Sequence, residues 1–153
     1  MLGGIGNSMI LGNFDTTFAA HPEMALYIPL IGGTGGNVGT QSSALVVQGL
    51  ANSSLDANNT WKQILKESVV APIISMLVYI YNFIRFGATA TVSYSVSLSL
   101  FAVVMFASIF GTLVPMTLEK LKIDPAIATG PFISITNDII GMMLYMGITV
   151  LLS

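Results

Sequence analysis

The stretch PLIGGTGGNVGTQSSALVVQGL, residues 29–50, decides how this chain can fold. Five glycines fall within the eight residues from Gly32 to Gly39, and the amides of Asn37 and Gln41 lie among or beside them. Glycines spaced four apart let helices approach closely, and polar groups at membrane depth are tolerated where they line a cavity or are covered by protein. The stretch therefore predicts a membrane helix that packs closely and borders a polar path.

The composition agrees with a membrane location. Of the 153 residues, 54% are hydrophobic and only 8% are charged, whereas soluble domains carry roughly 25% charged residues. Mean hydropathy is +0.82. So few charges cannot cover the surface of a soluble domain of this size. We therefore expect an all-α membrane protein in which residues 1–153 form a single transmembrane domain within a lipid bilayer.

Several functions are excluded by what the sequence lacks. The net charge of -2 comes with no basic cluster, so nucleic acid is not an expected partner. The absence of cysteine excludes disulfides, thiolate metal sites and thiol catalysis, and the single histidine, His21, excludes a multi-histidine site. No nucleophile–base pair or phosphate-binding loop is evident. The sequence therefore predicts that the protein is not an enzyme.

Five apolar runs organise the chain. Each of the last four is long enough to cross a bilayer core, which needs roughly 20 helical residues, and the first is short. The runs are 1–14, 24–51, 68–84, 92–117 and 126–153. We expect five transmembrane helices per protomer. Four lysines lie in the second and fourth connections, and only Arg85 lies in the others, which predicts a cytoplasmic N-terminus and an outside C-terminus in the plasma (inner) membrane.

One carboxylate lies near the centre of the last run. A charge at the bilayer centre costs about 3 kcal/mol on insertion scales, and no lysine or arginine occupies the middle of another run to pair with Asp138. A cation from solution is the partner that we favour. The alternative is a carboxyl that is hydrogen-bonded to neighbouring helices, or protonated.

Helical spacing gives two polar faces that could meet at this acid. Gly130, Ser134, Asp138 and Gly141 lie on or near one face of the last run, and the glycine-rich run presents a second polar stripe. Close helix packing through amide hydrogen bonds is the alternative use of that stripe. The candidate metal-binding residues are Asp138, Ser134 and Gly130; those lining or supporting the path are Asn37, Gln41, Gly33, Asn137 and Gly141; those at an outer mouth are Asp15 and Glu23.

The expected oligomer is a homodimer. One carboxylate is a poor match for a divalent ion, and five helices do not easily surround a hydrated pore, whereas a two-fold dimer brings two Asp138 side chains to one axis. Oxygen ligands without histidine or cysteine favour the Mg²⁺, Ca²⁺ and Mn²⁺ class, with Mn²⁺, Co²⁺ and Ca²⁺ as alternatives to Mg²⁺. Mg²⁺ sheds water reluctantly, so we expect it to pass largely hydrated.

Two segments together resemble a known family. PLIGGTGGNVGTQSSALVVQGLA (29–51) and IDPAIATGPFISITNDIIGMMLYMGI (123–148) are similar to the transmembrane domain of MgtE magnesium channels and transporters, as are FDTTF (14–18) and LVPMTLEKLKIDPA (113–126). The resemblance implies a homodimer of five-helix protomers, with the pore between the second and fifth helices. It also implies that Asp138 binds hydrated Mg²⁺ centrally.

Two departures from the family pattern leave the mechanism of gating undecided. MgtE proteins usually carry a cytoplasmic helical domain and paired CBS modules, which this sequence lacks, and Gly130 stands where some members have asparagine. The short first run is consistent with a truncated first helix. Two other functions stay open: a sodium- or proton-coupled exchanger on the same scaffold, and a membrane scaffold that transports nothing.

Overall fold

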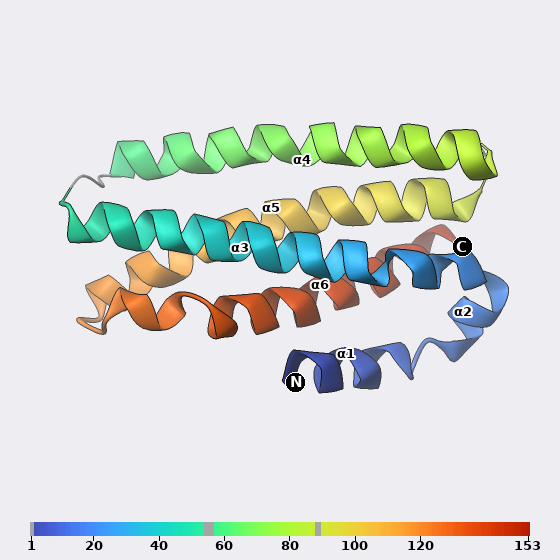
Figure 1. Cartoon of the computed structure of the whole chain (residues 1–153), viewed down its shortest axis with the longest axis horizontal. Helices are drawn as coiled ribbons and strands as arrows, with labels where there is room; N and C mark the ends of the chain where they lie inside the picture. The colour runs from blue at the N-terminus through green and yellow to red at the C-terminus, as the bar shows by residue number, and fades with distance from the viewer. Residues whose placement is uncertain (1, 54–56, 88–89) are drawn as a thin grey trace.

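The computed structural model describes residues 2–53, 57–87 and 90–153, and every regular element in them is helical (Figure 1). The all-α expectation is therefore confirmed for the described chain. The elements are α1 (Leu2–Leu11), α2 (Asp15–Ala20), the 3-10 helix η1 (Pro22–Tyr27), α3 (Ile28–Ala51), α4 (Ala57–Phe86), α5 (Thr91–Lys120), the 3-10 helix η2 (Pro125–Ala128) and α6 (Pro131–Leu152).

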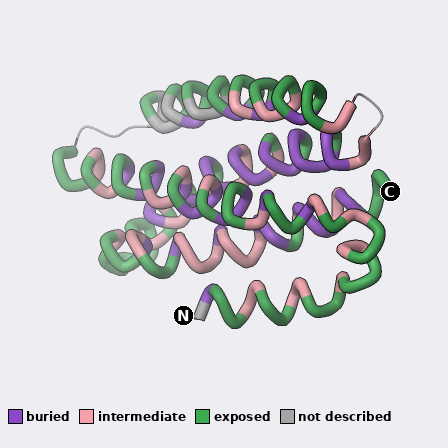
Figure 2. Tube along the Cα trace, turned by 45° about the vertical axis from the view of Figure 1, so that its right-hand side comes forward, coloured by how far each residue is buried: buried purple, intermediate pink, exposed green. Residues whose placement is uncertain are grey.

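Helix α5 forms the centre of a four-helix arrangement. It packs against α3, α4 and α6, while α1 packs along α6 (Figure 1). Buried residues are concentrated along α5, and α4 is exposed over most of its surface, as Figure 2 shows. The apolar core lies between η1, α3, α5 and α6, around side chains such as Ile31, Leu100, Met142 and Met146.

Small residues explain how α5 can occupy this central place. Its first half carries buried serines, and the hydroxyl of Ser97 donates to the Ser93 carbonyl at 2.8 Å, so the polar group is satisfied within its own helix. In its second half, a Cβ added to Gly111 would lie 2.4 Å from the carbonyl oxygen of Gly39. The backbones of α5 and α3 therefore approach each other at a point that only glycine permits.

The glycines of α3 form the same kind of contact with two helices. A Cβ added at Gly35 would lie 2.7 Å from the Val103 side chain of α5. One added at Gly39 would lie 1.8 Å from Nδ2 of Asn137 in α6. These distances are too short for any side chain. The predicted close approach of helices at the glycine-rich stretch is thus confirmed, with α5 and α6 as the neighbours.

Within the described residues, three helical segments are long and apolar enough to cross a membrane: Ile64–Phe86, Thr91–Lys120 and Pro125–Leu152. At 1.5 Å per residue, α3 is about 36 Å long and could also cross, but its glycines and amides lower its hydropathy. Helix α1 is about 15 Å long, half of a bilayer core. The expectation of five spans is therefore supported for three of them by length and composition.

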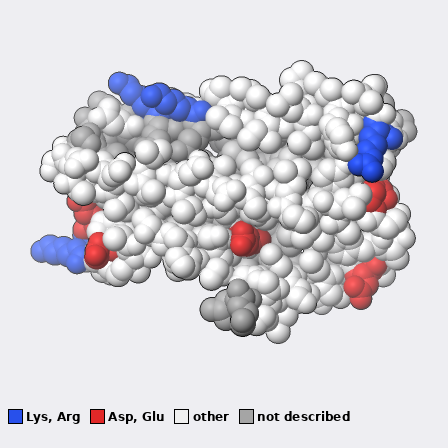
Figure 3. Space-filling view, in the orientation of Figure 1, with Lys and Arg blue, Asp and Glu red and all other residues white. Residues whose placement is uncertain are grey.

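The charged side chains mark the two ends of the bundle. Figure 3 shows Lys and Arg at both ends of the long axis, with a mostly uncharged surface between them. The end of α3, the start of α4 and the α5–α6 connection share one end of the bundle, and the end of α4 and the start of α5 lie at the other (Figure 1). Helix α1 starts in the middle of the bundle rather than at the lysine-bearing end, since Gly3 lies beside Asp138.

Candidate metal-binding cleft

Asp138 faces an open cleft between α1, α3 and α6 with a volume of about 280 Å³. The carboxylate is carried by the second turn of α6, a helix that begins with Pro131 in its first turn, where a missing N–H costs nothing. The polar side chains that line the cleft are those of Asn7, Asn37, Ser134 and Asp138, and glycines 32, 33 and 36 form part of its wall.

Glycines leave the room that the carboxylate occupies. A Cβ added at Gly36 of α3 would lie 2.9 Å from Oδ1 of Asp138 and 3.2 Å from Oγ of Ser134. On the other side, a Cβ added at Gly3 of α1 would lie 3.5 Å from Oδ2. The two carboxylate oxygens thus face different helices. The same glycine-rich face of α3 that lets helices approach also makes space for an acid.

Two side chains in this cleft present acceptor oxygens that have no hydrogen-bond partner among the described residues. Within the described part of the chain, no hydrogen bond or ion pair reaches Asp138. Oδ1 of Asn7 is buried and also lacks a hydrogen-bond partner. A carboxylate and an amide oxygen both accept hydrogen bonds or coordinate cations, and leaving either unsatisfied away from bulk water is costly. The cleft therefore offers oxygen atoms suited to a cation or to its water shell.

The structure brings together four of the residues singled out in the sequence: Gly33, Asn37, Ser134 and Asp138. It adds Asn7, which the sequence reasoning missed. Asn7 is the one amide in the first half of the short first run, and this polar interruption of an apolar segment was the signal that could have identified it.

Other predicted residues lie away from the cleft. Gln41 is exposed and lines a separate hollow beside α4. Asn137 is buried against Gly39, and both of its amide atoms lack a hydrogen-bond partner among the described residues. Gly141 is buried against Val103 of α5. Gly130 precedes α6 with φ +69°, and its carbonyl accepts the backbone N–H of Ser134 at 3.0 Å, which starts the helix. None of these four residues lines the cleft at Asp138.

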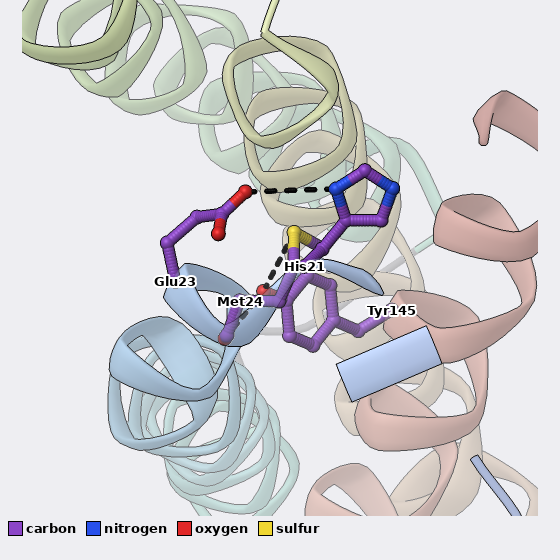
Figure 4. A network of polar contacts seen from close by, with 4 residues as sticks. All are labelled: His21, Glu23, Met24 and Tyr145. Carbon is purple, nitrogen blue, oxygen red and sulfur yellow. Dashed lines mark hydrogen bonds and ion pairs between the residues drawn. The ribbon is translucent and has the colours of Figure 1, made fainter. Parts of the chain in front are cut away.

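The two acids expected at an outer mouth lie at the end of the bundle where α3 begins. Asp15 starts α2 and is exposed, and Glu23 in η1 lies 3.6 Å from Nδ1 of His21 (Figure 4). Neither lines the cleft around Asp138.

Two tyrosines fix the segment that leads into α3. The hydroxyl of Tyr145 in α6 donates to the Met24 carbonyl at 2.7 Å, as Figure 4 shows. The hydroxyl of Tyr27 donates to Oδ1 of Asn82 in α4, a contact buried inside the bundle. Since both bonds hold η1 against the long helices, they set where α3 starts. They therefore help to place Gly32 and Gly36 opposite Asp138.

The donor set suits a hard cation that keeps its water. Among the described residues, no group of three His, Cys, Asp or Glu side chains could hold a bare metal ion. One carboxylate and a few neutral amide and hydroxyl oxygens cannot replace all the water ligands of a divalent ion, because together they carry only one negative charge. It is instead well matched to hydrogen-bonding the waters of an ion such as Mg²⁺, which dehydrates reluctantly.

Comparisons with known proteins agree with this chemistry. The family described as MgtE, divalent cation transporter, matches residues 28–148, which include α3 to α5 and most of α6. The magnesium transporter MgtE of Bacillus subtilis (strain 168) is 33% identical over 149 residues, and the alignment covers 95% of this chain and 33% of that protein.

Two further relatives are similar to the same extent. The magnesium transporter MgtE of Thermus thermophilus is 31% identical over 99% of this chain and 34% of its own length. That of Enterococcus faecalis is 28% identical over 95% of this chain and 33% of its own length. This chain therefore spans about one third of the length of the curated relatives that it matches. Since the family match covers well over half of the sequence, this chain belongs to the MgtE family of divalent cation transporters.

Proposed function

We propose that this chain moves divalent cations, with Mg²⁺ foremost, across a membrane, and that the cleft at Asp138 holds the ion. The observation that carries this proposal is that the Asp138 carboxylate and Oδ1 of Asn7, which have no hydrogen-bond partner among the described residues, line one open cleft. An intramembrane acid without a protein partner is destabilising unless something from solution compensates for it. The named activity of the three relatives, magnesium transport, supports the choice of ion.

The ion would be bound with most of its waters. Mg²⁺ has six ligands in an octahedron, and six waters at roughly 30 Å³ each come to roughly 180 Å³. The cleft has a volume of about 280 Å³, so a hydrated ion fits within it. In this arrangement Asp138, Ser134, Asn7 and Asn37 would accept hydrogen bonds from bound water.

A homodimer would complete the path. The cleft is open on the side where Asn37 and Gly33 are exposed, and a second copy placed there would bring another Asp138 toward the same axis. Two carboxylates would then balance the double charge of the ion. A two-fold interface between the α3 and α6 faces is the simplest closed arrangement that achieves this.

We infer the orientation in the membrane from the positions of the lysines. We place the end that bears Lys62, Lys66, Lys120 and Lys122 in the cytoplasm, and the C-terminus outside, because short cytoplasmic connections are enriched in Lys and Arg. Helix α3 would cross with the other long helices, since its polar groups are covered by protein or border the cleft. Helix α1 would then cover the outer half of the membrane beside α6.

Flux through liposomes containing the purified chain tests the proposal. We expect Mg²⁺ influx for the unmodified chain, and at least a tenfold loss for Asp138→Ala and Asp138→Asn. Glu119→Gln, which removes an exposed acid at the end of α5, should retain normal flux. Equal flux in Asp138→Ala and Glu119→Gln liposomes would reject the central role of Asp138.

The same liposomes separate the competing functions. Flux that requires a sodium or proton gradient would identify a coupled exchanger, whereas flux that follows only voltage and the Mg²⁺ gradient would identify a channel. A scaffold that transports nothing would give no flux and no stabilisation by Mg²⁺. The absence of a hydrogen-bond donor for Asp138 among the described residues favours transport, because a purely structural acid needs such a donor.

A further inference from the structure

A second feature lies on the opposite side of α3, where a furrow runs between α3 and α4. Both helices pack against α5, which forms the floor. Two adjoining hollows occupy this furrow, and Leu45 of α3 lines both of them. The furrow is separate from the cleft at Asp138, with which it shares no lining residue.

The outer hollow is basic. It has a volume of about 370 Å³ and is lined by Leu45, Asn59, Lys62 and Lys66. The two lysines are four residues apart on α4, so their side chains lie on one face of the helix. Neither lysine has an ion-pair partner within the part of the chain that the structure describes. Two ammonium groups therefore border the same hollow.

The inner hollow is mostly apolar. It has a volume of about 110 Å³ and is lined by Val38, Leu45, Val70 and Val104, with Gln41 as its polar member. Val70 lies one helical turn beyond Lys66, and Val38 lies about 10 Å along α3 from Leu45. The furrow thus changes from basic to apolar over a distance of about two helical turns.

This change coincides with an expected membrane surface. The candidate membrane span of α4 begins at Ile64, between the two lysines. Trp61 is 65% exposed beside Lys62, and tryptophan is typical of the headgroup level of a bilayer. The lysines would thus lie at headgroup depth, and Val70 would lie among the acyl chains.

We propose that this furrow binds an anionic phospholipid, with its phosphate between Lys62 and Lys66 and the start of an acyl chain against Leu45 and Val70. The amide of Gln41, in the inner hollow, would donate a hydrogen bond to an ester carbonyl. A soluble phosphate would use the lysines but not the apolar hollow behind them. The proposal does not rest on ion transport, since the two sites share no residue.

Trp61 makes a direct test possible, because it is the single tryptophan of the chain. The chain is reconstituted in phosphatidylcholine vesicles, and part of the lipid is replaced by phosphatidylglycerol with brominated acyl chains, which quench nearby tryptophan. A parallel series uses brominated phosphatidylcholine. We expect stronger quenching of Trp61 by the anionic lipid at equal content. The preference should be about 30-fold in relative binding, from roughly fivefold for each lysine.

Two matched double-lysine variants distinguish a specific lipid site from non-specific attraction by surface charge. Lys62→Gln with Lys66→Gln should abolish the preference for phosphatidylglycerol. Lys120→Gln with Lys122→Gln removes the same charge at the same end of the bundle, but at exposed positions that line neither hollow, and should keep the preference. Val70→Trp in a Trp61→Phe background would place the reporter in the inner hollow, where brominated chains should still quench it.

Two quenching results would overturn the proposal, and so would displacement of the lipid by phosphate. One is equal quenching of Trp61 in the unmodified chain by brominated phosphatidylglycerol and brominated phosphatidylcholine. The other is loss of the preference in both lysine-pair variants, which would mean that diffuse charge attracts the lipid. Addition of inorganic phosphate should not displace the lipid. If it does, the hollow binds free anions and the proposed lipid is wrong.

Discussion

At the scale of single residues, neighbouring positions on one helix have different roles because each residue turns the helix by 100°. Asp138 faces the open cleft, whereas Asn137 beside it is buried against Gly39. The sequence predicted that Asn37 would line or support a path at Asp138, and the structure places both residues in one cleft. It could not predict the surroundings of Asn137, because those depend on which helix packs at that angle.

The missed residue, Asn7, gives a test at this scale. Asn7→Ala removes an unpartnered acceptor from the cleft, so we expect about two- to tenfold weaker apparent affinity for Mg²⁺, the range for one neutral hydrogen bond. Two experiments measure this apparent affinity. One gives the concentration of Mg²⁺ at half-maximal flux, and the other gives the thermal stabilisation of the purified chain by Mg²⁺.

Asn13 supplies the control on the same short segment. Its side chain is exposed and donates to the Met9 carbonyl at 2.8 Å, away from the cleft. Asn13→Ala should leave the apparent affinity unchanged. If both alanine variants bind Mg²⁺ as the unmodified chain does, Asn7 contributes nothing to the ion site.

At the scale of elements, the polar stripe of α3 shows why residue spacing alone could not predict which polar side chains line the cleft. Each step of four residues advances the helix by 400°, which is 40° beyond a full turn. From Gly33 through Asn37 to Gln41 the stripe therefore rotates by about 80°. This rotation takes Gln41 out of the cleft and into the furrow beside α4. The helix was predictable from its apolar flanks, but the neighbour at each angle was not.

The glycines of α3 allow a sharp comparison within one element. A Cβ at Gly39 would meet Asn137 at 1.8 Å, whereas one at Gly33 would meet nothing within 4 Å. Gly39→Ala should force α3 away from α6 and destabilise the chain by about 1–3 kcal/mol. Gly33→Ala should be neutral, or stabilising by up to about 1 kcal/mol, because alanine favours the helix. Thermal unfolding in detergent measures the stability of both variants. Equal melting temperatures for Gly39→Ala and Gly33→Ala would show that α3 and α6 do not approach each other closely at Gly39.

At the scale of the whole molecule, the single chain leaves its candidate ion site open. The chain spans about one third of the length of the relatives that it matches, yet it contains α1, α3 and α6, the three helices that line the cleft. The apolar runs predicted the number of long helices, because burial in lipid demands continuous apolar segments. They did not predict that α5 would be central and α4 peripheral, since both helices are apolar. Small residues such as Ser97 and Gly111 let neighbouring helices pack against α5 and so place it at the centre.

The proposed dimer can be tested by cross-linking, because the chain has no native cysteine. Asn37→Cys places a thiol at the open side of the cleft, where a second copy would lie about one hydrated ion away. A short bifunctional thiol reagent added to membranes should give covalent dimers in high yield, and Mg²⁺ should lower the rate by occupying the path. Ile73→Cys, on the exposed face of α4, is the matched control and should stay monomeric. Dimers from Ile73→Cys with none from Asn37→Cys would move the interface to α4, and the two Asp138 side chains would then not share an axis.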